Sequence, residues 1–154
     1  MTSTTTSSTP VLAGKVAFVT GGSRGIGAAI VRRLARDGAA VAFSYSSSQA
    51  VAEELARSLE AEGGRALALK IDSADADALK AGIDRAAGHF GGRIDILVNN
   101  AGVLHLGPVE QFSLADFDRT IAVNVRAVFV AIQAALAHMG TGGRIVNIGS
   151  TNAE

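Results

Sequence analysis

Residues 16–34 read VAFVTGGSRGIGAAIVRRL and contain the pattern from which the fold can be predicted. The first five residues form an apolar, partly β-branched run typical of a buried strand. Ile26, Ile30 and Leu34 then recur every four residues, which is the spacing of one helical face. The turn between them, residues 21–27, contains four glycines. Glycines in such a turn let the backbone approach a pyrophosphate and leave the helix N–H groups directed at it, so the stretch predicts a dinucleotide-binding unit. A purely structural turn is the alternative.

The same alternation of strand and helix continues along the chain. Further strands are predicted at residues 40–44, 66–71, 94–98 and 144–148. Helices are predicted after residue 48 up to Gly63, at residues 75–90, and from the N-cap residue Ser113 to Met139. Alternating strands and helices build a parallel sheet with crossover helices, so we expect an α/β protein with a doubly wound sheet. Residues 1–14, rich in Thr and Ser, are expected to be a flexible tail, and residues 15–154 a single domain.

Composition narrows the classes of partner. With 48% hydrophobic and 18% charged residues, the chain is too apolar for a disordered protein. Fourteen basic and fourteen acidic residues cancel, which predicts no nucleic-acid partner and no anionic membrane partner. The uninterrupted apolar runs are too short for a membrane span, and no export signal precedes the first strand. The absence of cysteine excludes disulfides and thiolate metal sites, and no metal site is predicted. These features favour a cytoplasmic protein.

Four motifs resemble those of the short-chain dehydrogenase/reductase family. Thr20-Gly-x-x-x-Gly-Ile-Gly27 is similar to its cofactor signature, and residues 99–102, Asn-Asn-Ala-Gly, match a second motif after a strand. Asn124 and Ser150 are similar to the family's active-site Asn and Ser. The resemblance extends over residues 12–154 and implies a Rossmann-type fold that binds NAD or NADP.

The resemblance and the strand ends together indicate the cofactor site. No acid occurs between Asp37 and Glu53, so the carboxylate that would bind the ribose 2′-hydroxyl of NAD is missing. Ser46 and its neighbours follow the second strand, and Arg24 can pair with a 2′-phosphate, so NADP is predicted over NAD. Asp72 matches the family's acid at the adenine amino group; helix capping, an ordinary role for an Asp that ends a strand, is the alternative. The predicted cofactor-binding residues are Gly21, Ser23, Arg24, Gly25, Ile26, Gly27, Ser46, Asp72, Ser73, Asn99, Asn100, Ala101 and Gly102.

The catalytic set implied by the resemblance is only partly contained in the chain. Ser150 would orient the substrate oxygen and Asn124 would hold a water relay. The family's Tyr-x-x-x-Lys acid follows the Ser by about a dozen residues, beyond Glu154, and the single tyrosine, Tyr45, is followed four residues later by Gln49. We therefore expect the chain to be a truncated, inactive part of an NADP-dependent reductase.

The substrate expected from the resemblance is a small ketone or secondary alcohol, with 3-oxoacyl thioesters as the nearest type. A catalytically dead dinucleotide-binding or assembly module is the alternative. The apolar strand at residues 145–148 would be an exposed edge, so the isolated chain is expected to be marginally stable or to associate. A homo-oligomer is expected for the full-length family member.

Overall fold

The computed structural model describes residues 9–150, and its centre is one sheet of five parallel strands. The strands are β1 (Val16–Val19), β2 (Ala40–Tyr45), β3 (Arg65–Lys70), β4 (Ile96–Asn99) and β5 (Arg144–Asn147). They lie in the order β3-β2-β1-β4-β5, so the chain starts in the middle, fills one side and then crosses to the other. This order confirms the predicted doubly wound α/β fold and places a topological switch point between β1 and β4.

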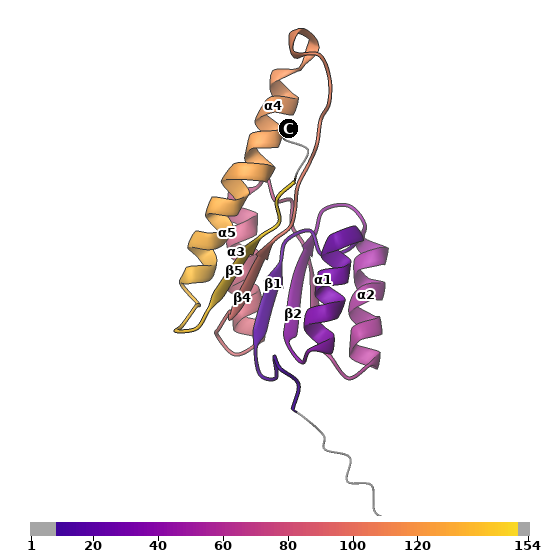
Figure 1. The fold of residues 1–154 in the computed structure, drawn as a ribbon, viewed down its shortest axis with the longest axis vertical. Helices are drawn as coiled ribbons and strands as arrows, with labels where there is room; N and C mark the ends of the chain where they lie inside the picture. The colour runs from indigo at the N-terminus through magenta and orange to yellow at the C-terminus, as the bar shows by residue number, and fades with distance from the viewer. Residues whose placement is uncertain (1–8, 151–154) are drawn as a thin grey trace, which may run out of the picture.

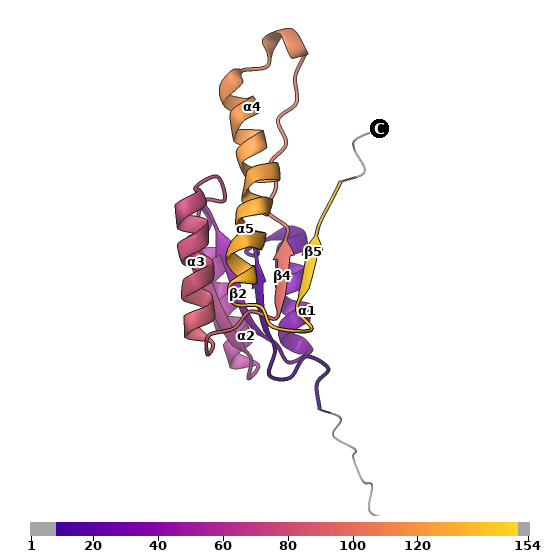
Figure 2. The ribbon, with the colours of Figure 1, turned by 90° about the vertical axis from the view of Figure 1, so that its left-hand side faces the viewer.

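Helices cover both faces of the sheet (Figure 1). Helices α1 (Gly25–Arg36) and α2 (Gln49–Ala61) lie on one face, and α3 (Ala76–His89) and α5 (Ala127–Leu136) lie on the other, as Figure 2 also shows. Alternate side chains of β1 enter opposite layers. Val16 and Phe18 pack with α3 and α5, whereas Ala17 and Val19 pack with α1 and α2. Such a strand is buried on both faces, which explains its continuous apolar sequence.

The long helix predicted from Ser113 to Met139 is interrupted. It consists of α4 (Leu114–Ile121), a π-helical segment η2 (Ala122–Arg126) and α5, and it ends at Leu136. Ser113 caps α4 as predicted, because its hydroxyl accepts a hydrogen bond from Asp116 N at 3.0 Å. A π segment inserts an extra residue into the helical turn and changes the direction of the side chains around it.

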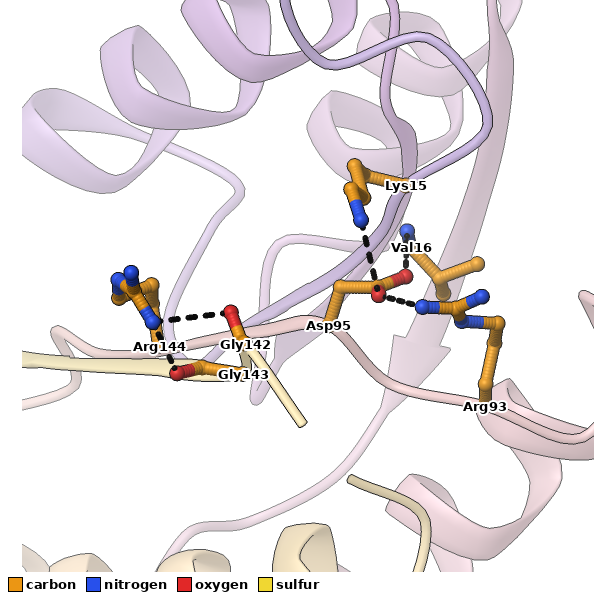
Figure 3. Close-up of polar contacts among 7 residues, drawn as sticks. All are labelled: Lys15, Val16, Arg93, Asp95, Gly142, Gly143 and Arg144. Atoms are coloured by element: carbon orange, nitrogen blue, oxygen red, sulfur yellow. Dashed lines mark hydrogen bonds and ion pairs between the residues drawn. The ribbon is translucent and has the colours of Figure 1, made fainter. Parts of the chain in front are cut away.

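At the amino-terminal edge of the sheet, Asp95 joins the strand ends through hydrogen bonds and ion pairs (Figure 3). This buried carboxylate accepts a hydrogen bond from Val16 N at 2.9 Å and pairs with the side chains of Arg93 and Lys15. The backbone of Asp95 also joins three strands, since its N–H donates to Val16 O and its carbonyl accepts from Arg144 N, both at 2.8 Å. Strand β4 begins at Ile96, two residues later than predicted, and the N–H of Ile94 donates to His138 O at 3.1 Å, outside the sheet.

The two ends of the described residues concern two predictions, the flexible tail and the exposed edge strand. Within the predicted tail, residues 11–14 form a turn, in which Leu12 N donates to Asp37 O at 2.8 Å and the Leu12 side chain packs on the α1 and α2 layer. Residues 1–8 of that tail lie outside the described residues. At the other end, β5 pairs only with β4 in the described part of the chain, and Ile145 and Val146 are exposed, as expected for an open apolar edge.

One helix in residues 9–150 is long and apolar enough to cross a membrane. It is the α4–η2–α5 helix, Leu114–Leu136, with a mean hydropathy of 1.4 over its most apolar window. Length and composition are weak evidence, because the core helix of a soluble protein passes the same test. Here α5 packs four alanines into the layer beside the sheet, namely Ala127, Ala131, Ala134 and Ala135.

Candidate functional site

A cavity of about 330 Å³ lies at the carboxyl ends of the strands, beside the switch point. Its walls come from the loops that follow β1, β2, β3 and β4, together with Arg119 of α4 and Val123 of η2. In open α/β sheets this is the edge at which ligands bind. The stretches lining it, in sequence order, are residues 21–27, 44–48, 71–73 and 100–103, which include the end of β2 and the start of α1. Gly22 is the only member of these ranges that does not line the cavity.

The glycine turn is held in shape by the loop after β4. Asn100 Nδ2 donates to the carbonyl oxygens of Thr20 and Gly21, at 3.1 and 3.0 Å. In return, the Thr20 hydroxyl accepts hydrogen bonds from the backbone N–H groups of Asn100 and Ala101, both at 3.0 Å. The turn and the Asn-Asn-Ala-Gly loop therefore form one rigid unit, although about 80 residues separate them in sequence.

Glycine stands at two positions of the turn for different structural reasons. A Cβ on Gly27 would overlap the carbonyl oxygen of Gly21 and the Asn100 side chain, so Gly27 is required by packing within the protein. Gly25 has φ +54°, and a Cβ there would meet no protein atom within 4 Å. Because Gly25 also lines the cavity, its missing side chain leaves open space at the cavity wall.

The amino terminus of α1 is directed at the same cavity without a side-chain cap. Its N-cap residue is Arg24, whose side chain makes no capping hydrogen bond, and the first turn carries no acid. By contrast, α3 and α4 are capped by the side chains of Asp75 and Ser113. Uncapped N–H groups and the positive end of the helix dipole favour an anionic ligand group.

The wall after β2 contains hydroxyl groups and no carboxylate. Ser46 and Ser47 are exposed and line the cavity, as does Arg24, which forms no ion pair with any described residue. Ser44, a buried residue absent from our predictions, accepts a hydrogen bond from Gly21 N at 3.0 Å. Ser44 thereby fixes the start of the glycine turn to β2.

The wall after β3 carries a charge pair. Asp72 Oδ1 accepts a hydrogen bond from Ala74 N at 2.9 Å, and Asp72 Oδ2 accepts one from Arg119 Nη1 at 2.8 Å. The hydrogen bond from Arg119 lowers the pKa of the Asp72 carboxyl below its ordinary value, and burial opposes this shift. The same contact raises the pKa of Arg119. Asp72 is therefore an ionised acceptor at neutral pH.

Asn124 lies in the π segment and reaches the loop after β4. Its Oδ1 accepts a hydrogen bond from Val103 N at 2.9 Å, and its Nδ2 donates to Val103 O at 2.8 Å. Asn124 therefore joins η2 to the Asn-Asn-Ala-Gly loop. Ser150 follows β5 and is exposed, and it makes a contact of its own within the structure.

The structure brings together 12 of the 13 residues that were predicted to bind the cofactor, all of which line the cavity. The exception is Asn99, which is 4% exposed and donates from Nδ2 to Asn147 Oδ1 of β5 at 2.8 Å. Neither Asn124 nor Ser150 is part of the described cavity wall. Some lining residues were not predicted from the sequence. Ile71, Val103 and Val123 carry no polar signal, and Arg119 belongs to α4, not to a loop that follows a strand.

A second cavity, of about 420 Å³, lies at the opposite edge of the sheet. It is lined by residues that precede β1, β2 and β3 and by the carboxyl ends of α1 and α2, including Arg36 and Gly63. Helix carboxyl ends carry partial negative charge, so the basic residues here offset the helix dipoles instead of forming an anion site. The cavity at the carboxyl edge is therefore the candidate functional site.

Comparison with known proteins identifies the family. The family described as short chain dehydrogenase matches residues 15–154. Elsinochrome reductase 1 of Elsinoe fawcettii is 40% identical over 147 residues, covering 96% of this chain and 55% of the relative. A short-chain dehydrogenase/reductase structure from Serratia marcescens is 62% identical with a TM-score of 0.90, covering 93% of this chain and 58% of that one.

A third relative was solved with a cofactor. The short-chain dehydrogenase from Burkholderia cenocepacia, in complex with NADP, is 55% identical with a TM-score of 0.89, covering 91% of this chain and 57% of that one. The chain spans a little over half the length of the relatives it matches. Sheet order, glycine turn and family match agree, and the chain belongs to the short-chain dehydrogenase/reductase family of oxidoreductases.

Proposed function

We propose that the chain is the NADP(H)-binding part of a short-chain reductase that interconverts a ketone and a secondary alcohol. The observation that carries this proposal is the composition of one cavity. It combines an uncapped helix amino terminus, an arginine without an ion pair among the described residues, and no acid after β2. The pyrophosphate would lie at the N–H groups of residues 25–27, where Gly25 leaves open space.

The preference for NADP over NAD is assigned to Arg24 and the serines after β2. An acid at the end of β2 would bond the ribose 2′-hydroxyl and repel a 2′-phosphate, and the residues there are Ser46, Ser47 and Ser48. The guanidinium of Arg24 can form a charge-assisted pair with the phosphate, and the serine hydroxyls can donate to it. NADP in the Burkholderia relative is consistent with this assignment.

The adenine end of the cofactor is assigned to the walls after β3 and β4. Asp72 would accept a hydrogen bond from the adenine amino group, and residues 100–102 would line the adenosine side. Ser73 is 9% exposed and lines the same wall. Asn99 is proposed to act indirectly, because its side chain holds β5 to β4 instead of facing the cavity.

NADPH, when bound, would supply the hydride for carbonyl reduction. Ser150 is proposed to donate a hydrogen bond to the substrate oxygen, which polarises the carbonyl. Asn124 is proposed to organise the proton relay, although its amide also holds Val103 in this structure. The 154 residues contain one tyrosine, Tyr45. Tyr45 contributes to the cavity wall at the end of β2, but it is only 7% exposed and packs in the layer under α1 and α2, so the proton donor of the reaction is not assigned to it.

The substrate is proposed to be a small carbonyl compound, with 3-oxoacyl thioesters as one candidate type. A homo-oligomer is proposed on the basis of an apolar stripe along α4, η2 and α5. It comprises the exposed residues Leu114, Phe117, Ile121, Val125, Phe129 and Leu136. The cytoplasmic location stays a prediction.

Cofactor titration tests the proposal. NADPH and NADH fluorescence would be followed on the 154-residue chain, on Arg24→Ala, and on the control Arg36→Ala at the opposite end of α1. Arg24→Ala should lower the affinity for NADPH about tenfold or more, which is the contribution of a hydrogen bond to a charged group. The affinity for NADH should stay nearly unchanged. Equal losses for both cofactors would remove Arg24 from the 2′-phosphate site, and no binding of either cofactor by the unmodified chain would reject the function.

A further inference from the structure

The protruding helix α4 contacts the cavity wall through an ion pair between Arg119 and Asp72. Helix α4 has no buried residue, and it extends past the carboxyl ends of the strands (Figure 2). Arg119, in its last turn, reaches Asp72 across 47 positions of sequence. Both residues line the cavity wall.

The geometry of the carboxylate leaves room for a ligand. Each Asp72 oxygen accepts one hydrogen bond from the protein, from Ala74 N and from Arg119 Nη1. A carboxylate has about four acceptor positions, so each oxygen keeps capacity for one further donor. The two protein donors fix the rotation of the carboxylate, and the ligand does not need to displace either of them.

Both groups are half-exposed, with 40% of the Arg119 side chain and 48% of the Asp72 side chain accessible. An exposed pair of this kind stabilises a fold little, by about 0–1 kcal/mol. The main effect of the Arg119–Asp72 pair is therefore to orient the Asp72 carboxylate at the cavity wall, and its contribution to folding is small.

We infer that Arg119 is a positioning residue for the adenine end of the cofactor, which holds the Asp72 carboxylate so that it accepts the adenine amino group. The inference rests on the proposed function, because it requires a dinucleotide in this cavity. It adds a residue from α4, outside the glycine turn and the Asn-Asn-Ala-Gly loop, that determines selectivity for an aminopurine. Affinity for the cofactor is then coupled to the docking of α4 on the loop after β3.

The test uses a cofactor analogue that lacks the amino group. Reduced nicotinamide purine dinucleotide phosphate carries a hydrogen atom where NADPH has the adenine amine, and its ring nitrogens are otherwise the same. The ratio of its dissociation constant to that of NADPH measures recognition of the amine alone. For the unmodified chain we expect a ratio of about ten, since the lost hydrogen bond is to a charged group.

Arg119→Gln should reduce this ratio to about two or three, with the NADPH dissociation constant rising about three- to fivefold. The matched control is Arg126→Gln, because Arg126 Nη2 donates to the carbonyl of Ala74 at 3.3 Å and does not touch the carboxylate. The control should keep the full ratio. Arg119→Met is a second variant, also a good helix former, which serves if Arg119→Gln does not give a native circular dichroism spectrum.

The outcomes are separable. If the unmodified chain binds neither ligand, the proposed function fails and the inference fails with it. If it binds both equally, or if the Arg119 variants keep the ratio, the inference is wrong while cofactor binding stands. Equal weakening of both ligands, or a collapsed ratio in Arg126→Gln as well, indicates a structural role for the helix and also overturns the inference.

Discussion

Substitution of two glycines in the same turn should separate folding from binding. Gly27→Ala places a Cβ against the Gly21 carbonyl and the Asn100 side chain, which is itself held by two hydrogen bonds. Overpacking against fixed atoms costs about 1–3 kcal/mol. One lost hydrogen bond of Asn100 adds about 1 kcal/mol. We expect a loss of about 3 kcal/mol, which lowers the Tm by about 6–12 °C for a chain of this length.

Gly25→Ala should behave differently. The new methyl meets no protein atom within 4 Å, and the cost comes from φ +54°. A left-handed conformation costs an alanine about 1–2 kcal/mol, and the smaller entropy of the unfolded chain returns about 0.5 kcal/mol. The expected loss is about 1 kcal/mol, or a Tm lower by about 2–4 °C. NADPH affinity should nevertheless fall at least about tenfold, since the methyl occupies the wall where the backbone approaches the pyrophosphate.

Gly91→Ala is the matched control for backbone strain. Gly91 has φ +96° and open space around its Cβ position, and it lines neither cavity. It should lose at least as much stability as Gly25→Ala, because φ +96° lies farther from the left-handed well, and it should retain NADPH affinity. Thermal melting at 222 nm and NADPH fluorescence titration measure both quantities. A Gly27→Ala variant as stable as the unmodified chain, or a Gly25→Ala variant with unchanged NADPH affinity, would refute the reasoning.

Three further predictions concern stability, pH and association. Asp95→Asn should lower the free energy of unfolding by about 2 kcal/mol and the Tm by about 4–8 °C, because it weakens the charged contacts that join the strand ends. A Tm within about 1 °C of that of the unmodified chain would contradict this expectation. The pKa of Asp72 is lowered in the fold, so its pair with Arg119 stabilises above the ordinary carboxyl range and is lost as the pH falls through the lowered value. The small Tm difference between the unmodified chain and Arg119→Gln should therefore shrink as the pH falls below the ordinary carboxyl range, and a difference that does not decrease with falling pH would contradict the assignment. Phe129→Glu, on the apolar stripe, should reduce self-association in analytical ultracentrifugation, and a monodisperse, cooperatively melting monomer of the unmodified chain would contradict the expected association.

Local patterns were sufficient for the strands, the glycine turn and the fold class. The alternation of apolar runs with helical spacing depends only on nearby residues, and parallel strands bring all their carboxyl ends to one edge. That is why loops chosen from sequence converge on a single cavity in the structure. The NADP assignment likewise uses residues within a few positions of the strand ends.

Tertiary structure alone decided which side chains meet across those loops. Asn99 and Asn100 are neighbours in sequence, yet the register of β4 with β5 turns Asn99 toward Asn147 and leaves Asn100 on the glycine turn. The π segment around Asn124 and the pairing of Asp72 with Arg119 carry no local signal. Strand and helix periods are local properties of the chain, whereas the partner of a loop side chain depends on sheet order and register, and these arise only when all the strands have packed.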